Sequence, residues 1–128
     1  GYKLELDAGI EGLKEMHKRG IRVLPGGDYG FAWTPHGTNA RDLDHFVTLL
    51  GFTPMEAIKA ATVHGGAIMQ DEKLGKVERG YTADLLLVDG DPLSDITVLQ
   101  DSSKIVGIMK GGAFHKDPDV SDLLAQIG

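Results

Sequence analysis

The sequence contains no cysteine, and this absence excludes several kinds of site. Among its 128 residues there is none that could form a disulfide framework, a thiolate zinc site, an iron–sulfur cluster or a cysteine nucleophile. A chain without cysteine also suits a reducing compartment, so we expect a cytoplasmic protein.

Basic clusters, aromatic side chains and long apolar runs are scarce as well. The chain has 13 Lys and Arg against 19 Asp and Glu, and 6% of its residues are aromatic. Nucleic acids and anionic membrane surfaces both attract clustered basic side chains. No apolar run approaches the roughly 20 residues of a membrane span. We therefore expect no nucleic-acid partner and no membrane, whereas a hydrophobic content of 41% suffices for a folded core.

The first part of the chain shows the helix-then-strand pattern of a parallel α/β sheet. A helix is predicted for residues 7–18, with Asp7 as its cap, and a short buried strand for residues 21–24. Thr38 or Asn39 is expected to cap the next helix. Its apolar stripe consists of Leu43, Phe46, Val47 and Leu50.

A third helix has the strongest start signal in the sequence. Thr53 is predicted as its N-cap, with Pro54 at the first helical position and Glu56 completing a capping box. Four alanines in this helix predict close packing against another element. They are Ala57, Ala60, Ala61 and Ala67.

The character of the sequence changes near residue 71 and becomes β-rich. Strands are predicted for residues 83–88, 104–110 and 113–116, and Gly111-Gly112 has the signature of a two-residue hairpin. The Asp-Gly-Asp-Pro stretch at residues 89–92 is predicted to be a turn. Both halves resemble parts of larger folds, so we expect a fragment of a longer chain.

Motif searches leave Asp28 as the main candidate for chemistry. The sequence contains no P-loop, GxGxxG or HExxH pattern. Asp28 directly follows the predicted strand, and His36 lies in the same loop. Loops at the carboxyl ends of parallel strands form the active-site face, where a carboxylate can bind a metal or act as a general base. On spacing alone, a simple turn role for Asp28 remains the favoured alternative.

Four stretches occur in an order that resembles a known family. They are "GGD" after the strand, "PHGTN" in the next loop, "GFTPMEAIKAAT", and "LGKVERGYTADLLLVDGDPLSDI". Together they resemble the C-terminal end of metal-dependent amidohydrolase superfamily members, most of all the imidazolonepropionase-like and prolidase-like ones. The resemblance implies an α/β fold in two parts. Residues 1–70 would hold the last strand and helices of a (β/α)8 TIM-type barrel, and residues 71–128 the C-terminal strands of a small β-sandwich with a terminal tail.

The resemblance also implies roles for four residues. Asp28 would be both catalytic and a metal contact, taking a proton from the bound water and passing it to the leaving amine. The metal would be divalent, commonly zinc. Tyr29, Trp33 and His36 would face the substrate, a small amide or a peptide-like molecule such as a dipeptide. For Trp33, packing of its loop is an equal alternative.

The sequence departs from the family pattern in one respect. The other metal ligands of the family are an HxH pair, a mid-barrel carboxylate or carboxylated lysine, and two histidines, and none has a counterpart here. A full barrel needs about 250 residues. We therefore expect a C–N hydrolase for the full-length parent, little or no activity for this chain alone, and a metal in the parent that this chain alone need not hold. The alternatives are a stand-alone, non-catalytic remnant and a module whose β-rich tail forms a homo-oligomer.

Overall fold

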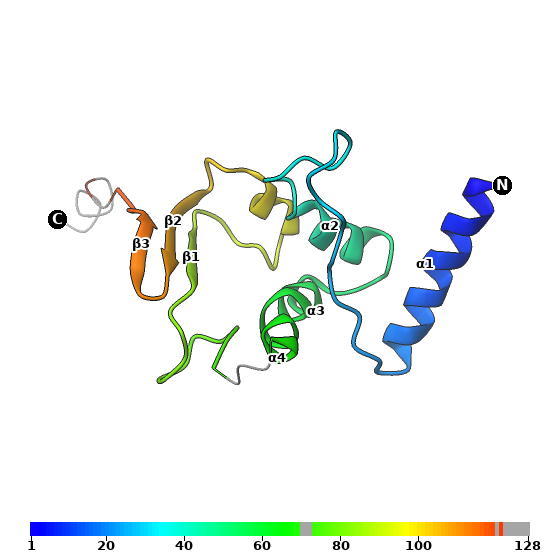
Figure 1. Cartoon of the computed structure of the whole chain (residues 1–128), viewed down its shortest axis with the longest axis horizontal. Helices are drawn as coiled ribbons and strands as arrows, with labels where there is room; N and C mark the ends of the chain where they lie inside the picture. Colours follow the sequence, from blue (N-terminus) through cyan, green and yellow to red (C-terminus); the bar gives the residue numbers. More distant parts are fainter. Residues whose placement is uncertain (70–72, 120, 122–128) are drawn as a thin grey trace.

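The computed structural model describes residues 1–69, 73–119 and 121. Figure 1 shows α1 at one end of the molecule, the other helices in the middle and a three-stranded sheet at the opposite end. The described residues form nine elements. They are α1 Tyr2–Lys18, α2 Arg41–Thr48, α3 Pro54–Lys59, the π-helix η1 Ala60–His64, α4 Gly65–Ile68, β1 Leu85–Val88, the 3-10 helix η2 Ile96–Gln100, β2 Ile105–Lys110 and β3 Ala113–Lys116.

The first helix is longer than predicted. It begins at Tyr2 with Gly1 as its N-cap, so Asp7 lies inside α1 and its predicted role as a cap is wrong. The additional first turn contains Lys, Leu and Glu, which are good helix formers. Tyr2 is 83% exposed, whereas Ile10 of α1 packs against the core.

The strand predicted for residues 21–24 is absent. A strand requires a neighbour to satisfy its backbone hydrogen bonds, and the sheet in the described residues consists of β1, β2 and β3 alone. Val23 and Leu24 pack instead against the helical core, while Ile21 is 53% exposed. The apolar pattern of this segment therefore reflects packing against helices in the structure.

The helical core is formed by α2, the turn that follows it, α3 and the start of η1. Its buried members are Phe46, Leu50, Phe52, Ala57 and Ala60. Large side chains from α2 and from the turn after it thus meet a small-residue face, and the ring centroids of the two phenylalanines are 4.8 Å apart. This confirms the predicted close packing for two of the four alanines. The other two, Ala61 and Ala67, are exposed, which is a correction.

The caps predicted for the second and third helices differ in outcome. The capping box of Thr53 and Glu56 is present as predicted. The prediction of a side-chain cap from Thr38 or Asn39 is wrong, because α2 begins after Ala40 without one. The main-chain carbonyls of Thr38 and Asn39 instead accept hydrogen bonds from the first N–H groups of α2, each at 3.1 Å.

The β-rich part follows the prediction closely. β1, β2 and β3 form an antiparallel sheet in that order, with Lys110 opposite Ala113. Gly111 and Gly112 have φ values of +57° and +84°, as a tight hairpin with both central residues left-handed requires. The first strand is shorter than predicted, beginning at Leu85. The tail prediction for residues 117–128 falls largely outside the described residues.

Among the described residues, the contacts between the helical and β-rich parts include one at α2 and a second at η1. η2 packs against α2, with Ile96 buried. At the second place, Gly75 lies against η1, where an added Cβ would collide with the carbonyl oxygen of Thr62.

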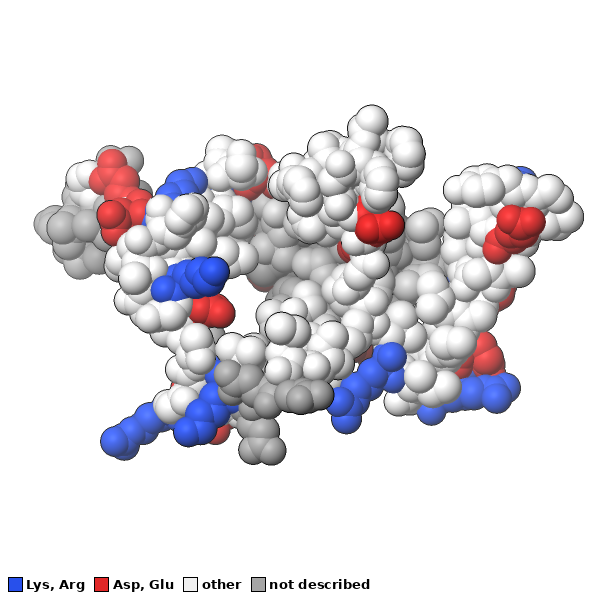
Figure 2. Space-filling view, in the orientation of Figure 1, with Lys and Arg blue, Asp and Glu red and all other residues white. Residues whose placement is uncertain are grey.

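Within the described residues, no helix is long and apolar enough to cross a membrane. On the face shown in Figure 2, basic side chains lie along one edge with acidic ones near them, without a continuous basic patch.

Candidate active site

Asp28 lies in the long connection between α1 and α2 and is exposed. Its main-chain carbonyl accepts a hydrogen bond of 2.7 Å from the hydroxyl of Thr34, which closes the loop on itself. The side chain of Asp28 is therefore exposed to solvent, on a loop that is closed by a hydrogen bond of its own.

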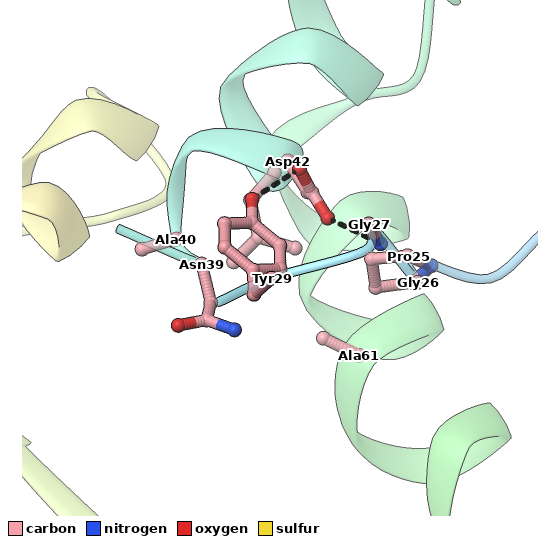
Figure 3. Close-up of a pocket in the computed structure, with 9 residues that line it drawn as sticks. Pro25, Gly26, Gly27, Tyr29, Asn39, Ala40, Asp42 and Ala61 are labelled. Atoms are coloured by element: carbon pink, nitrogen blue, oxygen red, sulfur yellow. Dashed lines mark hydrogen bonds between the residues drawn. The ribbon is translucent and has the colours of Figure 1, made fainter. Parts of the chain in front are cut away.

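A second aspartate, Asp42, holds the residues on both sides of Asp28. Its Oδ1 accepts a hydrogen bond of 2.6 Å from the Tyr29 hydroxyl, and its Oδ2 accepts one of 3.1 Å from the Gly27 amide (Figure 3). Burial raises the pKa of Tyr29, and the hydrogen bond to Asp42 raises it further. A Cβ at Gly27 would come within 2.6 Å of the Tyr29 ring and 2.9 Å of Asp42 Oδ2, so glycine is needed there.

A pocket of about 290 Å³ lies beside this cluster (Figure 3). Its lining joins the loop, the start of α2 and the π-helix: Pro25, Gly26, Gly27, Tyr29, Asn39, Ala40, Asp42, Leu43 and Ala61. Both chain neighbours of Asp28 are in this lining, so the predicted substrate residue Tyr29 faces a cavity next to Asp28.

The other two predicted substrate residues lie further along the loop. Residues 31–34 form a tight turn, in which Thr34 N–H donates to the Phe31 carbonyl at 3.1 Å, and the preceding Gly30 N–H donates to the Thr34 carbonyl at 2.8 Å. The rings of Phe31 and Trp33 stack with centroids 5.4 Å apart, and Trp33 is 74% exposed. The His36 ring lies against Gly30, two residues from Asp28. Trp33 and His36 are outside the pocket lining.

A second group of polar side chains joins α1 to α3. The His17 ring stacks on Phe52 with centroids 3.6 Å apart, and its Nε2 lies 3.6 Å from Glu56 Oε2. With His64 and Lys59 these residues line a pocket of about 420 Å³. His17 is therefore half-buried between α1 and the core.

Asp42 has only a weak signal in the sequence as part of the site. Asp42 and Asp44 both lie in the first turn of α2, where acidic side chains are common because they favour the positive end of the helix dipole. Only the folded structure separates the two, since Asp42 alone is bonded to the loop of Asp28.

The described residues do not make up a complete metal site. No three His, Asp or Glu side chains among them gather into a group that could hold a metal ion. Asp28 provides a single exposed carboxylate, a donor suitable for a divalent cation. Asp28 is therefore a possible donor to a metal within the described residues, which hold no complete group of ligands.

Comparison with known protein families shows to which family the chain belongs. Residues 3–114 match the sequence model described as "Amidohydrolase family". The chain belongs to the amidohydrolase family. The resemblance expected from the sequence is thereby confirmed.

Three relatives show where this amidohydrolase chain lies in the family. It is 32% identical over 116 residues to ochratoxinase from Aspergillus niger, a match of 89% of the chain and 23% of that protein. The ochratoxinase crystal structure superposes with a TM-score of 0.80, over 88% of this chain and 26% of that one. A Xaa-Pro dipeptidase structure with bound methionine superposes with a TM-score of 0.73 at 30% identity, over 84% and 25%. The 5'-deoxyadenosine deaminase of Methanopyrus kandleri is 28% identical over 126 residues, a match of 85% and 29%.

The chain thus spans about a quarter of the relatives that it matches. Such coverage is consistent with a fragment of an amidohydrolase fold.

Proposed function

We propose that the chain is the C-terminal part of a metal-dependent hydrolase that cleaves C–N bonds. Residues 1–70 would complete the barrel and residues 71–128 would belong to a small β-sandwich with a terminal tail. The observation that carries this proposal is the exposed carboxylate of Asp28 in a family-matched chain, on a loop held from both sides by Asp42. By itself the chain would have little or no activity.

Asp28 would move the proton in this reaction. Its exposed carboxylate would accept a proton from the attacking water and return it to the leaving amine, as a general base and then a general acid. A divalent metal, zinc in this proposal, would lower the pKa of the water and polarise the scissile carbonyl when bound. Asp28 would be one contact of this metal, and its other ligands would come from outside this chain.

The proposed substrates are small amides and dipeptide-like molecules. Tyr29 lines the pocket beside Asp28 and would contact the substrate there. His36 and the exposed Trp33 would contact it from the rest of the loop. Amide cleavage is favoured over deamination because ochratoxinase and the Xaa-Pro dipeptidase are more similar to this chain than the deaminase is.

The test compares Asp28→Asn with Asp44→Asn in the complete protein, supplied with zinc. Asp44 is the control because it is an aspartate of α2 that lies outside both the loop of Asp28 and the lining of the pocket. The substrates are methionyl-proline, ochratoxin A and 5'-deoxyadenosine. We expect hydrolysis of an amide, with a kcat that falls by about 10²–10⁴-fold in Asp28→Asn. Equal kcat values in the two variants would remove Asp28 from the reaction, and turnover of 5'-deoxyadenosine alone would replace amide cleavage by deamination.

The non-catalytic alternative is supported by the missing group of metal ligands in the described residues. In that case the 128-residue chain should fold cooperatively alone. It should also bind no zinc after dialysis against zinc and then against zinc-free buffer. One tightly retained zinc ion per chain would contradict it.

The homo-oligomer alternative is supported by β3, whose four residues are exposed at the edge of the sheet. A monomer in light scattering at high concentration would contradict that alternative.

A further inference from the structure

The loop of Asp28 is fastened to α2 through one side chain. The two carboxylate oxygens of Asp42 bind the Gly27 amide at 3.1 Å and the Tyr29 hydroxyl at 2.6 Å. These donors come from the residue before Asp28 and the residue after it. We propose that Asp42 is a positioning residue, which holds the Asp28 carboxylate in its working direction. This inference rests on the proposed function of Asp28.

The strength of these bonds supports a positioning role. Hydrogen bonds to an ionised carboxylate are roughly twice as strong as neutral ones. Because one bond restrains the main chain before Asp28 and the other restrains the side chain after it, the backbone of Asp28 is held on both sides. If Asp42 only stabilised the start of α2, its two carboxylate oxygens would not both need to bind this loop.

The element that carries Asp42 is well anchored. α2 places Phe46 in the buried core and Leu43 against it. A catalytic group supported from a rigid helix is held more accurately than one supported by its own loop. Gly27 completes the arrangement, since any side chain there would strike Tyr29 and Asp42.

Two substitutions of Asp42 separate positioning from simple presence. Asp42→Asn keeps the size of the side chain, but its amide offers one acceptor oxygen and turns an NH2 group toward the second donor. Asp42→Glu keeps two acceptor oxygens, and the adjacent pocket of about 290 Å³ has room for the extra methylene. Asp44→Asn removes the same charge from the same turn of α2 and is the matched control.

The experiment measures kcat and KM for the fastest of the three substrates named above, in the complete zinc-loaded protein. Relative to Asp44→Asn, we expect Asp42→Asn to lower kcat by about 10²-fold, because small displacements of a catalytic group have effects of that size. The fall in kcat should exceed the change in KM, which the loosened Tyr29 also affects, and the melting temperature should match that of the control. Asp42→Glu should recover about tenfold in kcat if carboxylate geometry is what matters.

Hydrogen exchange provides a readout that does not depend on activity. The Gly27 amide should exchange faster in Asp42→Asn than in Asp44→Asn, because a neutral amide oxygen is a weaker acceptor than the carboxylate that it replaces. An unchanged exchange rate would overturn the inference. So would an Asp42→Asn kcat equal to that of the control, or a loss of kcat that merely follows a fall in melting temperature.

Asp28→Asn, measured alongside, separates this inference from the proposed function. If Asp28→Asn is inactive and Asp42→Asn behaves like the control, the positioning role alone is wrong. If Asp28→Asn retains the control kcat, the proposed role of Asp28 is wrong, and a positioning role for Asp42 has no catalytic group to act on.

Discussion

The helical part, residues 1–69, and the β-rich part, residues 73–119, are held together by different interactions. The helical part has a buried cluster of five side chains drawn from α2, α3, η1 and the turn between them. The strands of the β-rich part bury no large side chain, and β3 is exposed along its whole length. Long-range packing therefore stabilises the first part, whereas backbone pairing and local turns stabilise the second.

The turns of the β-rich part illustrate this local stabilisation. Asp91, Asp95 and Asp101 each accept a hydrogen bond from the main-chain N–H two residues later. Hydrogen bonds from neighbouring Ser or Thr side chains are the largest cause that lowers the pKa of each. Such turns need no distant residue to form.

The largest expected difference between the parts comes from removing one phenylalanine in each. Phe46→Ala should lower the free energy of unfolding by about 3–5 kcal/mol, because it empties part of the buried cluster. Phe114→Ala in β3, where the side chain is 53% exposed, should change it by less than about 0.5 kcal/mol. Urea unfolding of both variants measures the difference. Equal losses would show that the sheet is as dependent on packing as the helices are.

A smaller effect is expected where the two parts touch. Gly75 and Gly80 have φ values of +80° and +88°, so alanine is strained at both. Only at Gly75 would the new Cβ collide with the Thr62 carbonyl, whereas Gly80 has open space. Gly75→Ala should therefore be less stable than Gly80→Ala by about 1–3 kcal/mol, the usual range for overpacking. Thermal or urea unfolding measures this difference. Equal stabilities of the two variants would show that η1 can move away from the added Cβ at no measurable cost.

The same contrast explains which features the sequence could predict. The hairpin at Gly111-Gly112 and the capping box of Thr53 and Glu56 depend on residues within a few positions of each other, and both are present. The strand at residues 21–24 depends on partner strands, which the described residues do not provide, and it is absent. Local patterns succeed where the interactions that satisfy them are also local.

The candidate site follows this rule too. Asp28 can be chosen from the sequence because it follows an apolar segment and because the surrounding motifs resemble a family. Its support by Asp42 cannot, because the bonds join residues 13 and 15 positions apart and Asp42 resembles any acidic residue in a first helical turn. The long-range part of the site therefore required the folded structure.

The smallest expected effect concerns the charge of Glu56 in the capping box. Glu56 Oε2 accepts hydrogen bonds from the Thr53 amide at 2.8 Å and the Thr53 hydroxyl at 3.0 Å, and His17 Nε2 lies 3.6 Å away. The bond from the Thr53 amide is the largest cause that lowers the pKa of Glu56 below its ordinary value of 4.5. A carboxyl whose pKa is lowered by folding stabilises the protein above the unfolded pKa, and this contribution is lost as pH falls through the folded pKa.

Glu56→Gln tests this contribution because it keeps an acceptor oxygen for Thr53 and removes the charge. We expect the variant to be less stable than the parent at pH 7, and the difference to disappear as the pH falls below 4.5 through the lowered pKa of Glu56. Urea unfolding at several pH values measures both. Glu11→Gln is the control, since Glu11 forms an exposed pair with Lys14 in α1 and lies outside the cap. If the difference in free energy of unfolding between Glu56→Gln and the parent stays constant with pH, the geometry of the cap alone accounts for the stabilisation. The charge of Glu56 would then contribute nothing to the contact with His17 that joins α3 to α1.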